Sequence, residues 1–186
     1  AGKITGRRKT IDPLKQVFSL AWGSKRLYDF LDNNPGLASY PFDYVNHPGR
    51  IARNDNVVSV NTAIEVDLLG QICSEPVGTG PISGTVAQLA FMEGAYRSQG
   101  GQSFICLTST SKQHDGSLQS NIKPVLTRGA IIACSRSASP VIVTEYGTAD
   151  MRRRTTRERA EALINIAHPS FQDKLISAAK QMKIWR

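Results

Sequence analysis

The stretch Val57-Val-Ser-Val-Asn-Thr-Ala-Ile-Glu-Val-Asp-Leu-Leu-Gly70 carries the clearest structural pattern of the chain. From Val57 to Val66 it alternates and is rich in β-branched residues, which is typical of a β-strand with one buried face. Gly70 then supplies a turn, and Gln71-Ile-Cys-Ser follows as a second strand. A strand and its return therefore lie near the middle of the sequence.

Short apolar runs on both sides of this stretch predict further strands. The run Val17 to Trp22 is expected to be a buried strand, and three later runs have the continuous apolar character of strands covered on both faces. These later runs are Ser103 to Leu107, Ala130 to Cys134 and Val141 to Thr144.

Helical patterns fill the intervals between the expected strands. Ser24 is a candidate N-cap for a helix that stops before Pro35 and Gly36. Thr155 or Thr156 begins another, which Pro169 is expected to end, with His168 at its C-terminal end, and a last helix follows from about Ser170. Strands interleaved with helices predict an α/β fold with an open, mostly parallel or mixed sheet flanked by helices. With no internal repeat or linker, we expect a single domain over residues 1–186.

Composition excludes several classes of function. The sequence holds no apolar run near the roughly 20 residues that span a membrane and no apolar leader at its N-terminus, so we expect a cytoplasmic protein without a membrane partner. The three cysteines and three histidines lack metal-ligand spacing, so no metal site is expected. Ser109 and Ser111 lack the Gly-x-Ser-x-Gly motif of serine hydrolases.

The formal net charge of +8 has three interpretations. Lysines and arginines can simply coat solvent faces, or a basic rim can attract a ligand that carries phosphates. Nucleic acid is the third candidate partner, but no RNA- or DNA-binding signature is present, so we expect none.

Three motifs in this order resemble one family. They are Asn61-Thr-Ala-Ile-Glu-Val-Asp-Leu-Leu-Gly70, Thr144-Glu-Tyr-Gly147 and the run from Glu158 to Pro169. Together they resemble the C-terminal domain of the acetyl-CoA hydrolase/transferase family, which includes 4-hydroxybutyrate and butyrate:acetate CoA-transferases. The resemblance implies that a nucleophilic glutamate lies shortly before Ala1, on an N-terminal domain of the same protein that would be a partner of this one. A homodimer is a further arrangement that the sequence leaves open.

The resemblance also implies a reaction and the groups that support it. A glutamate carboxylate takes CoA from one carboxylic acid and passes it to another through an anhydride and a glutamyl-CoA thioester, and each step forms an oxyanion. Asn46 matches a side-chain donor to that oxyanion, although an Asn before His-Pro is also typical of a turn. The backbone N–H of Ala87 matches the second donor. The family has paired glycines where Val86 and Ala87 stand here, so the methyl group of Ala87 narrows the site.

Further positions match residues that contact CoA, which is a substrate and not a permanently bound cofactor. They are Asn61, Gly84, Gln88 and Lys112. Asn61 can equally be a strand residue bonded to its neighbours, and Lys112 a solvated loop lysine. Glu145 matches an acid that orients the nucleophile or keeps it basic, and an ion pair with Arg152, Arg153 or Arg154 is its structural alternative.

Three functions remain open on these grounds. The first is half of a CoA-transferase for short carboxylic acids, the second is a CoA-thioester hydrolase of the same family, and the third is a non-catalytic binding or assembly module. The acyl group is not specified by the sequence.

Overall fold

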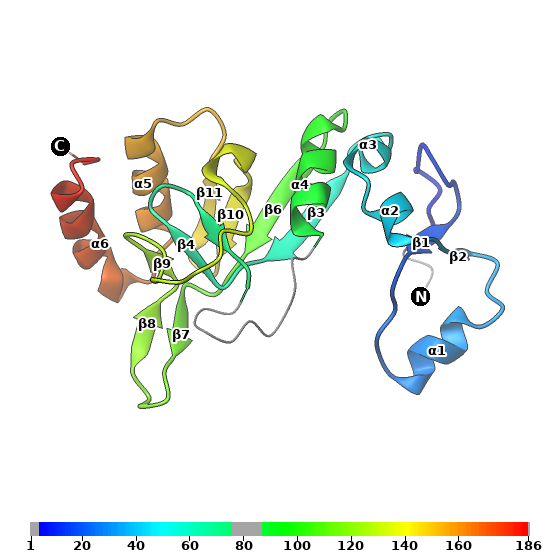
Figure 1. The fold of residues 1–186 in the computed structure, drawn as a ribbon, viewed down its shortest axis with the longest axis horizontal. Coiled ribbons are helices and arrows are strands. Elements are labelled where there is room, and N and C mark those ends of the chain that lie inside the picture. The colour runs from blue at the N-terminus through cyan, green and yellow to red at the C-terminus, as the bar shows by residue number, and fades with distance from the viewer. Residues whose placement is uncertain (1–3, 76–86, 186) are drawn as a thin grey trace. The chain divides into compact units, whose positions relative to one another are not determined.

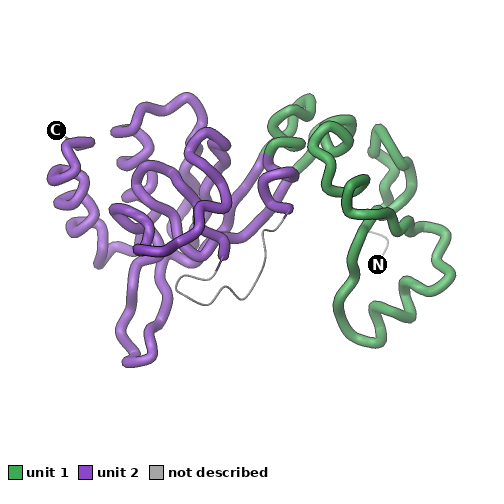
Figure 2. The backbone as a smooth tube through the Cα atoms, in the orientation of Figure 1, with its two compact units in different colours: residues 1–58, 93–102 green, residues 59–92, 103–186 purple. Residues whose placement is uncertain are grey.

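The computed structural model describes residues 4–75 and 87–185, which form two compact units. Unit 1 comprises residues 1–58 and 93–102, and unit 2 comprises residues 59–92 and 103–186 (Figure 2). Three elements include residues of both units, so the division does not follow the ends of helices and strands. The single domain expected over residues 1–186 stays a prediction.

Unit 1 is built from short elements (Figure 1). These are β1 (Gln16–Phe18), α1 (Lys25–Leu31), β2 (Leu37–Ser39), α2 (Phe42–Val45) and α3 (Pro48–Ile51). Strands β1 and β2 pair in parallel, with Val17 opposite Ala38. Ser24 is the N-cap of α1, as predicted. The buried strand expected from Val17 to Trp22 is wrong in extent and in burial, because β1 ends at Phe18, its residues are only half-buried, and Trp22 is 89% exposed.

The main sheet has four strands in the order β11-β10-β6-β3. Their bounds are β3 (Val58–Thr62), β6 (Gln102–Cys106), β10 (Val141–Thr144) and β11 (Gly147–Asp150). Strand β10 runs parallel to β6 and antiparallel to β11, so the sheet is mixed. A second sheet has the order β5-β4-β9, and β7 pairs with β8 in a hairpin. These strands are β4 (Glu65–Asp67), β5 (Ile72–Cys73), β7 (Thr110–Lys112), β8 (Leu118–Ser120) and β9 (Ile122–Lys123).

Helices accompany these sheets and complete the mixed α/β fold. They are α4 (Gln88–Arg97), the 3-10 turn η1 (Arg136–Ala138), α5 (Thr156–Asn165) and α6 (Pro169–Gln181). In unit 2, α5 lies beside β11, and α6 lies beside α5 (Figure 1). The hydrophobic core is in unit 2, where Val66, Ile105, Ile142 and Leu163 are fully buried. The predicted α/β class with mixed sheets flanked by helices is confirmed.

The turn between β4 and β5 depends on a glycine. Gly70 has φ +88°, a conformation that side-chain-bearing residues rarely adopt. The Asp67 carboxylate accepts hydrogen bonds from the backbone N–H groups of Leu69 and Gln71, at 3.0 and 2.9 Å, which closes the turn. Strand β5 therefore returns antiparallel to β4, as the sequence predicted.

Three further expectations about the elements were wrong. The strand expected from Val57 to Val66 is divided, because β3 ends at Thr62 and β4, in another sheet, begins at Glu65. The run Ala130 to Cys134 forms only an isolated bridge between Ile72 and Cys134, and Ile131 and Ile132 are 45% and 48% exposed. Pro169 begins α6 instead of ending α5, and proline suits that first position because it needs no N–H partner there.

Candidate active site

The parallel pairing of β6 and β10 brings two polar residues together. Val143 of β10 lies opposite Cys106 of β6, so both strands end at the same edge of the sheet. Glu145 follows β10 directly, and Ser109 follows β6 after a short segment. The hydroxyl of Ser109 donates to Oε1 of Glu145 at 2.5 Å, and its backbone N–H donates to Oε2 at 2.9 Å. Both carboxylate oxygens are therefore fixed.

This contact favours the ionised form of Glu145. The Ser109 hydroxyl holds the pKa of the Glu145 carboxyl below its usual range, and the nearby His168 lowers it further. The Ser109 side chain is fully buried, whereas Glu145 is exposed. The result is a fixed negative charge that a ligand can reach from solvent. The Glu145 carboxylate is held by these two hydrogen bonds from Ser109 and not by the ion pair considered as its alternative. Arg152 forms an ion pair with Asp150, at 2.7 Å.

Sequence reasoning missed Ser109 as the partner of Glu145. In the sequence, Ser109 is notable only for lacking the Gly-x-Ser-x-Gly motif of serine hydrolases. The available signal was its place just beyond a predicted parallel strand, because polar residues at the carboxyl ends of neighbouring strands meet at one edge.

Asn46 lies in unit 1, at the corner between two short helices. It is the C-cap of α2, and its backbone N–H donates to the Phe42 carbonyl at 2.8 Å. His47 is then the N-cap of α3, and Pro48 is its first residue. The turn that the sequence allowed for Asn46 is present. Its half-buried side-chain amide makes no hydrogen bond with any residue that the structure describes, so that amide is available to a ligand.

The start of α4 holds two further predicted residues. Ala87 immediately precedes the helix and is half-buried. Gln88, the first residue of α4, is 5% exposed, its Nε2 has no nitrogen or oxygen partner among residues 4–75 and 87–185, and its side chain lies beside the buried thiol of Cys134, whose pKa it lowers against the larger effect of burial. A thiol sulfur is a weak hydrogen-bond acceptor, so this buried amide keeps donor capacity that a ligand can use. Gly84 and Val86 lie outside the described residues.

Asn61 and Lys112 were expected to contact CoA. Asn61 lies in β3 and donates from Nδ2 to the Ser59 hydroxyl at 2.8 Å, so a bond to a strand neighbour, the structural alternative, is present. Lys112 is the last residue of β7 and is exposed at the hairpin with β8. Its contact with CoA stays a prediction.

The structure thus brings Ser109 to Glu145 and leaves the side-chain amides of Asn46 and Gln88 without nitrogen or oxygen partners among the described residues. Within the described part of the chain, no group of three or more metal-binding side chains is assembled. None of its helices is long and apolar enough to cross a membrane.

Comparison with known proteins identifies the family. The model of the acetyl-CoA hydrolase/transferase C-terminal domain matches residues 23–179. The chain belongs to this family. A probable butyrate:acetyl-CoA coenzyme A-transferase of Syntrophomonas wolfei is 58% identical over 186 residues, which are the whole of this chain and 41% of that protein. The resemblance inferred from the three motifs is confirmed.

Solved structures of acetyl-CoA hydrolase/transferase relatives have the same fold. RipA from Yersinia pestis is 39% identical with a TM-score of 0.90, over 98% of this chain and 40% of that one. A 4-hydroxybutyrate CoA-transferase from Porphyromonas gingivalis is 40% identical with a TM-score of 0.78, over 96% of this chain and 40% of that one. The chain spans about two fifths of the length of these relatives.

Proposed function

We propose that the full-length protein that carries this chain is a CoA-transferase. It moves CoA between short-chain carboxylic acids of the 4-hydroxybutyrate, butyrate and acetate type, in the cytoplasm. Family membership over most of the chain supports this assignment, as do the names of relatives that act on butyrate and 4-hydroxybutyrate.

The reaction proceeds through two covalent states of one glutamate, which the N-terminal domain supplies. The carboxylate attacks the thioester carbonyl, the C–S bond breaks, and CoA leaves as a thiolate, which gives an acyl-glutamyl anhydride. The thiolate then attacks the glutamyl carbonyl, releases the first carboxylate and leaves glutamyl-CoA. A second carboxylate reverses these steps and departs as the new thioester.

The fixed charge of Glu145 is the observation that carries the proposal. A carboxylate held beside a second carboxylate raises the pKa of that second group, which makes it a better base and nucleophile. Glu145 meets the requirement for this role because Ser109 keeps it ionised and exposed at the end of β10. We assign Glu145 to the orientation and activation of the nucleophile.

In this proposal, neutral hydrogen-bond donors stabilise the oxyanion. The Asn46 amide and the Ala87 backbone N–H are assigned to the tetrahedral oxygen, since amides donate strongly and do not titrate near neutral pH. The Gln88 amide, which has no nitrogen or oxygen partner among the described residues, supports a binding role at the start of α4. Asn61, Gln88, Gly84 and Lys112 are assigned to CoA, with the exposed Lys112 suited to a phosphate.

Replacing Asn46 tests the oxyanion assignment. In the full-length protein, Asn46→Ala is expected to lower kcat by roughly a hundredfold or more with little change in the affinity for the thioester, because the donor acts mainly on the transition state. Steady-state rates with butyryl-CoA and acetate measure it. Asn165→Ala, on the exposed last residue of α5, is the matched control and is expected to keep the wild-type rate.

Three results would each contradict a part of this proposal. A raised KM with unchanged kcat in Asn46→Ala would place the amide in substrate binding. Thioester cleavage that does not depend on an acceptor carboxylate would make the protein a hydrolase, and no turnover with or without acceptor would leave a binding module.

A further inference from the structure

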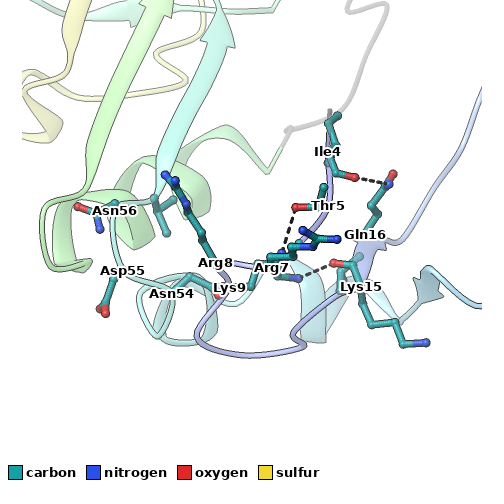
Figure 3. A pocket seen from close by; sticks show the side chains of 13 residues that line it. Ile4, Thr5, Arg7, Arg8, Lys9, Lys15, Gln16, Asn54, Asp55 and Asn56 are labelled. Carbon is teal, nitrogen blue, oxygen red and sulfur yellow. Dashed lines mark hydrogen bonds between the residues drawn. The ribbon is translucent and has the colours of Figure 1, made fainter. Parts of the chain in front are cut away.

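A basic cavity lies within unit 1, and its lining includes none of the residues assigned to the transfer reaction. It is open to solvent, has a volume of about 890 Å³, and is lined by segments 4–9, 15–17 and 54–57 (Figure 3). The proposed function assigns no role to any of these segments. Volumes of this order are typical of sites for small organic ligands.

The backbone of the first segment is fastened on two sides. The Gly6 carbonyl accepts hydrogen bonds from the N–H groups of Lys9 and Leu14, at 3.2 and 3.0 Å. Gly6 has φ +64°, and a Cβ there would lie 3.0 Å from the Leu14 backbone, so the turn requires glycine. On the other side, Oδ1 of Asn54 accepts from the N–H groups of Thr10 and Ile11, at 3.1 and 3.2 Å. Arg7 and Arg8 therefore extend from an anchored turn.

The cavity carries a strong excess of positive charge. Four cationic side chains line it, and Asp55 is the one carboxylate among its lining residues. The cations are Arg7, Arg8, Lys9 and Lys15. Both lysines donate to backbone carbonyls, Lys9 to Lys15 at 3.1 Å and Lys15 to Pro35, which uses one N–H of each ammonium group and leaves its charge uncompensated.

The two arginines have their donors available. Neither guanidinium group makes a hydrogen bond or an ion pair with any residue of the described ranges. Figure 3 shows both side chains leaving the anchored turn in different directions, Arg7 toward Gln16 and Arg8 toward the side of Asn56. Like charges placed together repel one another, so an anion with several charges gains more here than a single carboxylate does.

From this arrangement we infer that the cavity binds a diphosphate group. Guanidinium groups bind phosphate oxygens through paired N–H donors, and the lysines add point charges. None of the lining residues is aromatic, so a nucleobase has no stacking surface in the cavity. The cavity therefore recognises its ligand through the phosphates. The diphosphate can belong to a nucleoside diphosphate or to CoA, and the second source rests on the proposed function.

Titration of inorganic pyrophosphate into the full-length protein by calorimetry tests the site. The double variant Arg7→Ser/Arg8→Ser is expected to bind pyrophosphate at least tenfold more weakly, and the affinity of the wild type is expected to fall as salt rises. Arg26→Ser, on exposed α1 outside the cavity, is the matched control and keeps the wild-type affinity. Asp55→Asn is expected to tighten binding, because it removes a carboxylate that repels the ligand.

Enzyme kinetics and a competition experiment distinguish CoA from a nucleoside diphosphate as the source of the diphosphate. If CoA supplies the diphosphate, the double variant has a raised KM for acyl-CoA and an unchanged KM for the phosphate-free acyl-pantetheine. If a nucleoside diphosphate does, ADP competes with pyrophosphate and the KM for acyl-CoA stays unchanged. Equal pyrophosphate affinity in the wild type and the double variant, or no binding by the wild type, would overturn the inference. Pyrophosphate binding is measured without turnover, so absence of transferase activity leaves this result readable.

Discussion

At the scale of single residues, the ionisation of Glu145 depends on one buried hydroxyl. We predict that Ser109→Ala in the full-length protein lowers kcat about tenfold or more. Loss of the hydroxyl raises the pKa of Glu145, so the carboxylate becomes protonated at a higher pH than in the wild type. The acid side of the profile of kcat against pH therefore moves to higher pH, and steady-state rates from pH 4 to 8 measure the move.

A conservative variant and a neighbour serve as controls for Ser109. Ser109→Thr keeps the hydroxyl and is expected to recover most of the activity and the original pH profile. Ser111→Ala removes a half-buried hydroxyl from the same segment without touching Glu145, and it should behave as wild type. An unchanged pH profile in Ser109→Ala would reduce Ser109 to a structural residue.

A second carboxylate, Glu65, stabilises the fold through its charge. Its side chain is 3% exposed and lies 2.8 Å from Nζ of Lys123, and its Oε1 accepts from the Thr127 N–H at 2.7 Å. Burial alone would raise the pKa of Glu65, but the hydrogen bonds from Lys123 and Thr127 outweigh burial and leave that pKa lowered. The stability that Glu65 contributes is present above its unfolded pKa, about 4.3, and is lost as the pH falls through the lower folded pKa.

Glu65→Gln is therefore expected to change stability in a pH-dependent way. At pH 7 the variant leaves Lys123 without a charged partner, and its free energy of unfolding should fall by about 3–5 kcal/mol. Between about pH 5 and 3 the wild type loses stability steeply, whereas the variant changes less. Urea unfolding at several pH values measures both effects, and parallel curves would show that Glu65 carries no linked proton.

Residue identity alone located part of the candidate site. Glu145 stood out because an acid that ends an apolar strand needs a partner, but the partner is 36 positions earlier and becomes a neighbour only through the pairing of β6 with β10. The buried amide of Gln88 likewise has no local signal, because burial depends on the surrounding fold. Spacing along a chain does not encode such contacts.

At the scale of elements, the sequence narrowed the cap of α5 to Thr155 or Thr156, and the structure has Thr155 as the N-cap. Thr155 accepts from the Glu158 N–H at 3.3 Å, and the Glu158 carboxylate accepts from the Thr155 N–H at 2.7 Å, which is a capping box. We predict that Thr155→Ala lowers the free energy of unfolding by about 1 kcal/mol. Thermal and urea unfolding measure the loss. Thr155→Ser keeps the cap and should stay near the wild type, and an equal loss in both variants would contradict the capping role.

Elements that depend on tertiary context could not be predicted. The apolar run Ala130 to Cys134 suggested a buried strand, yet its middle residues are exposed, because periodicity cannot show what covers a segment. His168 was expected to end a helix, but its Nδ1 accepts from the Ser170 N–H at 3.2 Å at the start of α6. A His-Pro pair can follow the last turn of one helix or begin the next helix, and the sequence alone does not distinguish the two positions.

At the scale of the whole molecule, the core and the charges are distributed unevenly. The buried apolar cluster lies in unit 2, whereas unit 1 consists of short elements around a cavity with four cationic side chains. The sequence predicted the fold class from its alternating strands and helical faces, but it gave no sign of this division. Net charge is one number for the chain, and only the structure shows where the charges collect.

This chain holds only part of the groups that the proposed reaction needs. It spans about two fifths of its relatives, and the proposed reaction takes its nucleophilic glutamate from the N-terminal domain. The chain alone is therefore expected to form no acyl-CoA from acetate and a donor thioester, while the full-length protein does so at a steady rate. The isolated chain must first show cooperative unfolding, so that inactivity reflects the missing nucleophile and not a missing fold. Transfer by the folded chain alone would contradict the assignment, because Asn46, Ala87 and Glu145 would then need a nucleophile from within this sequence.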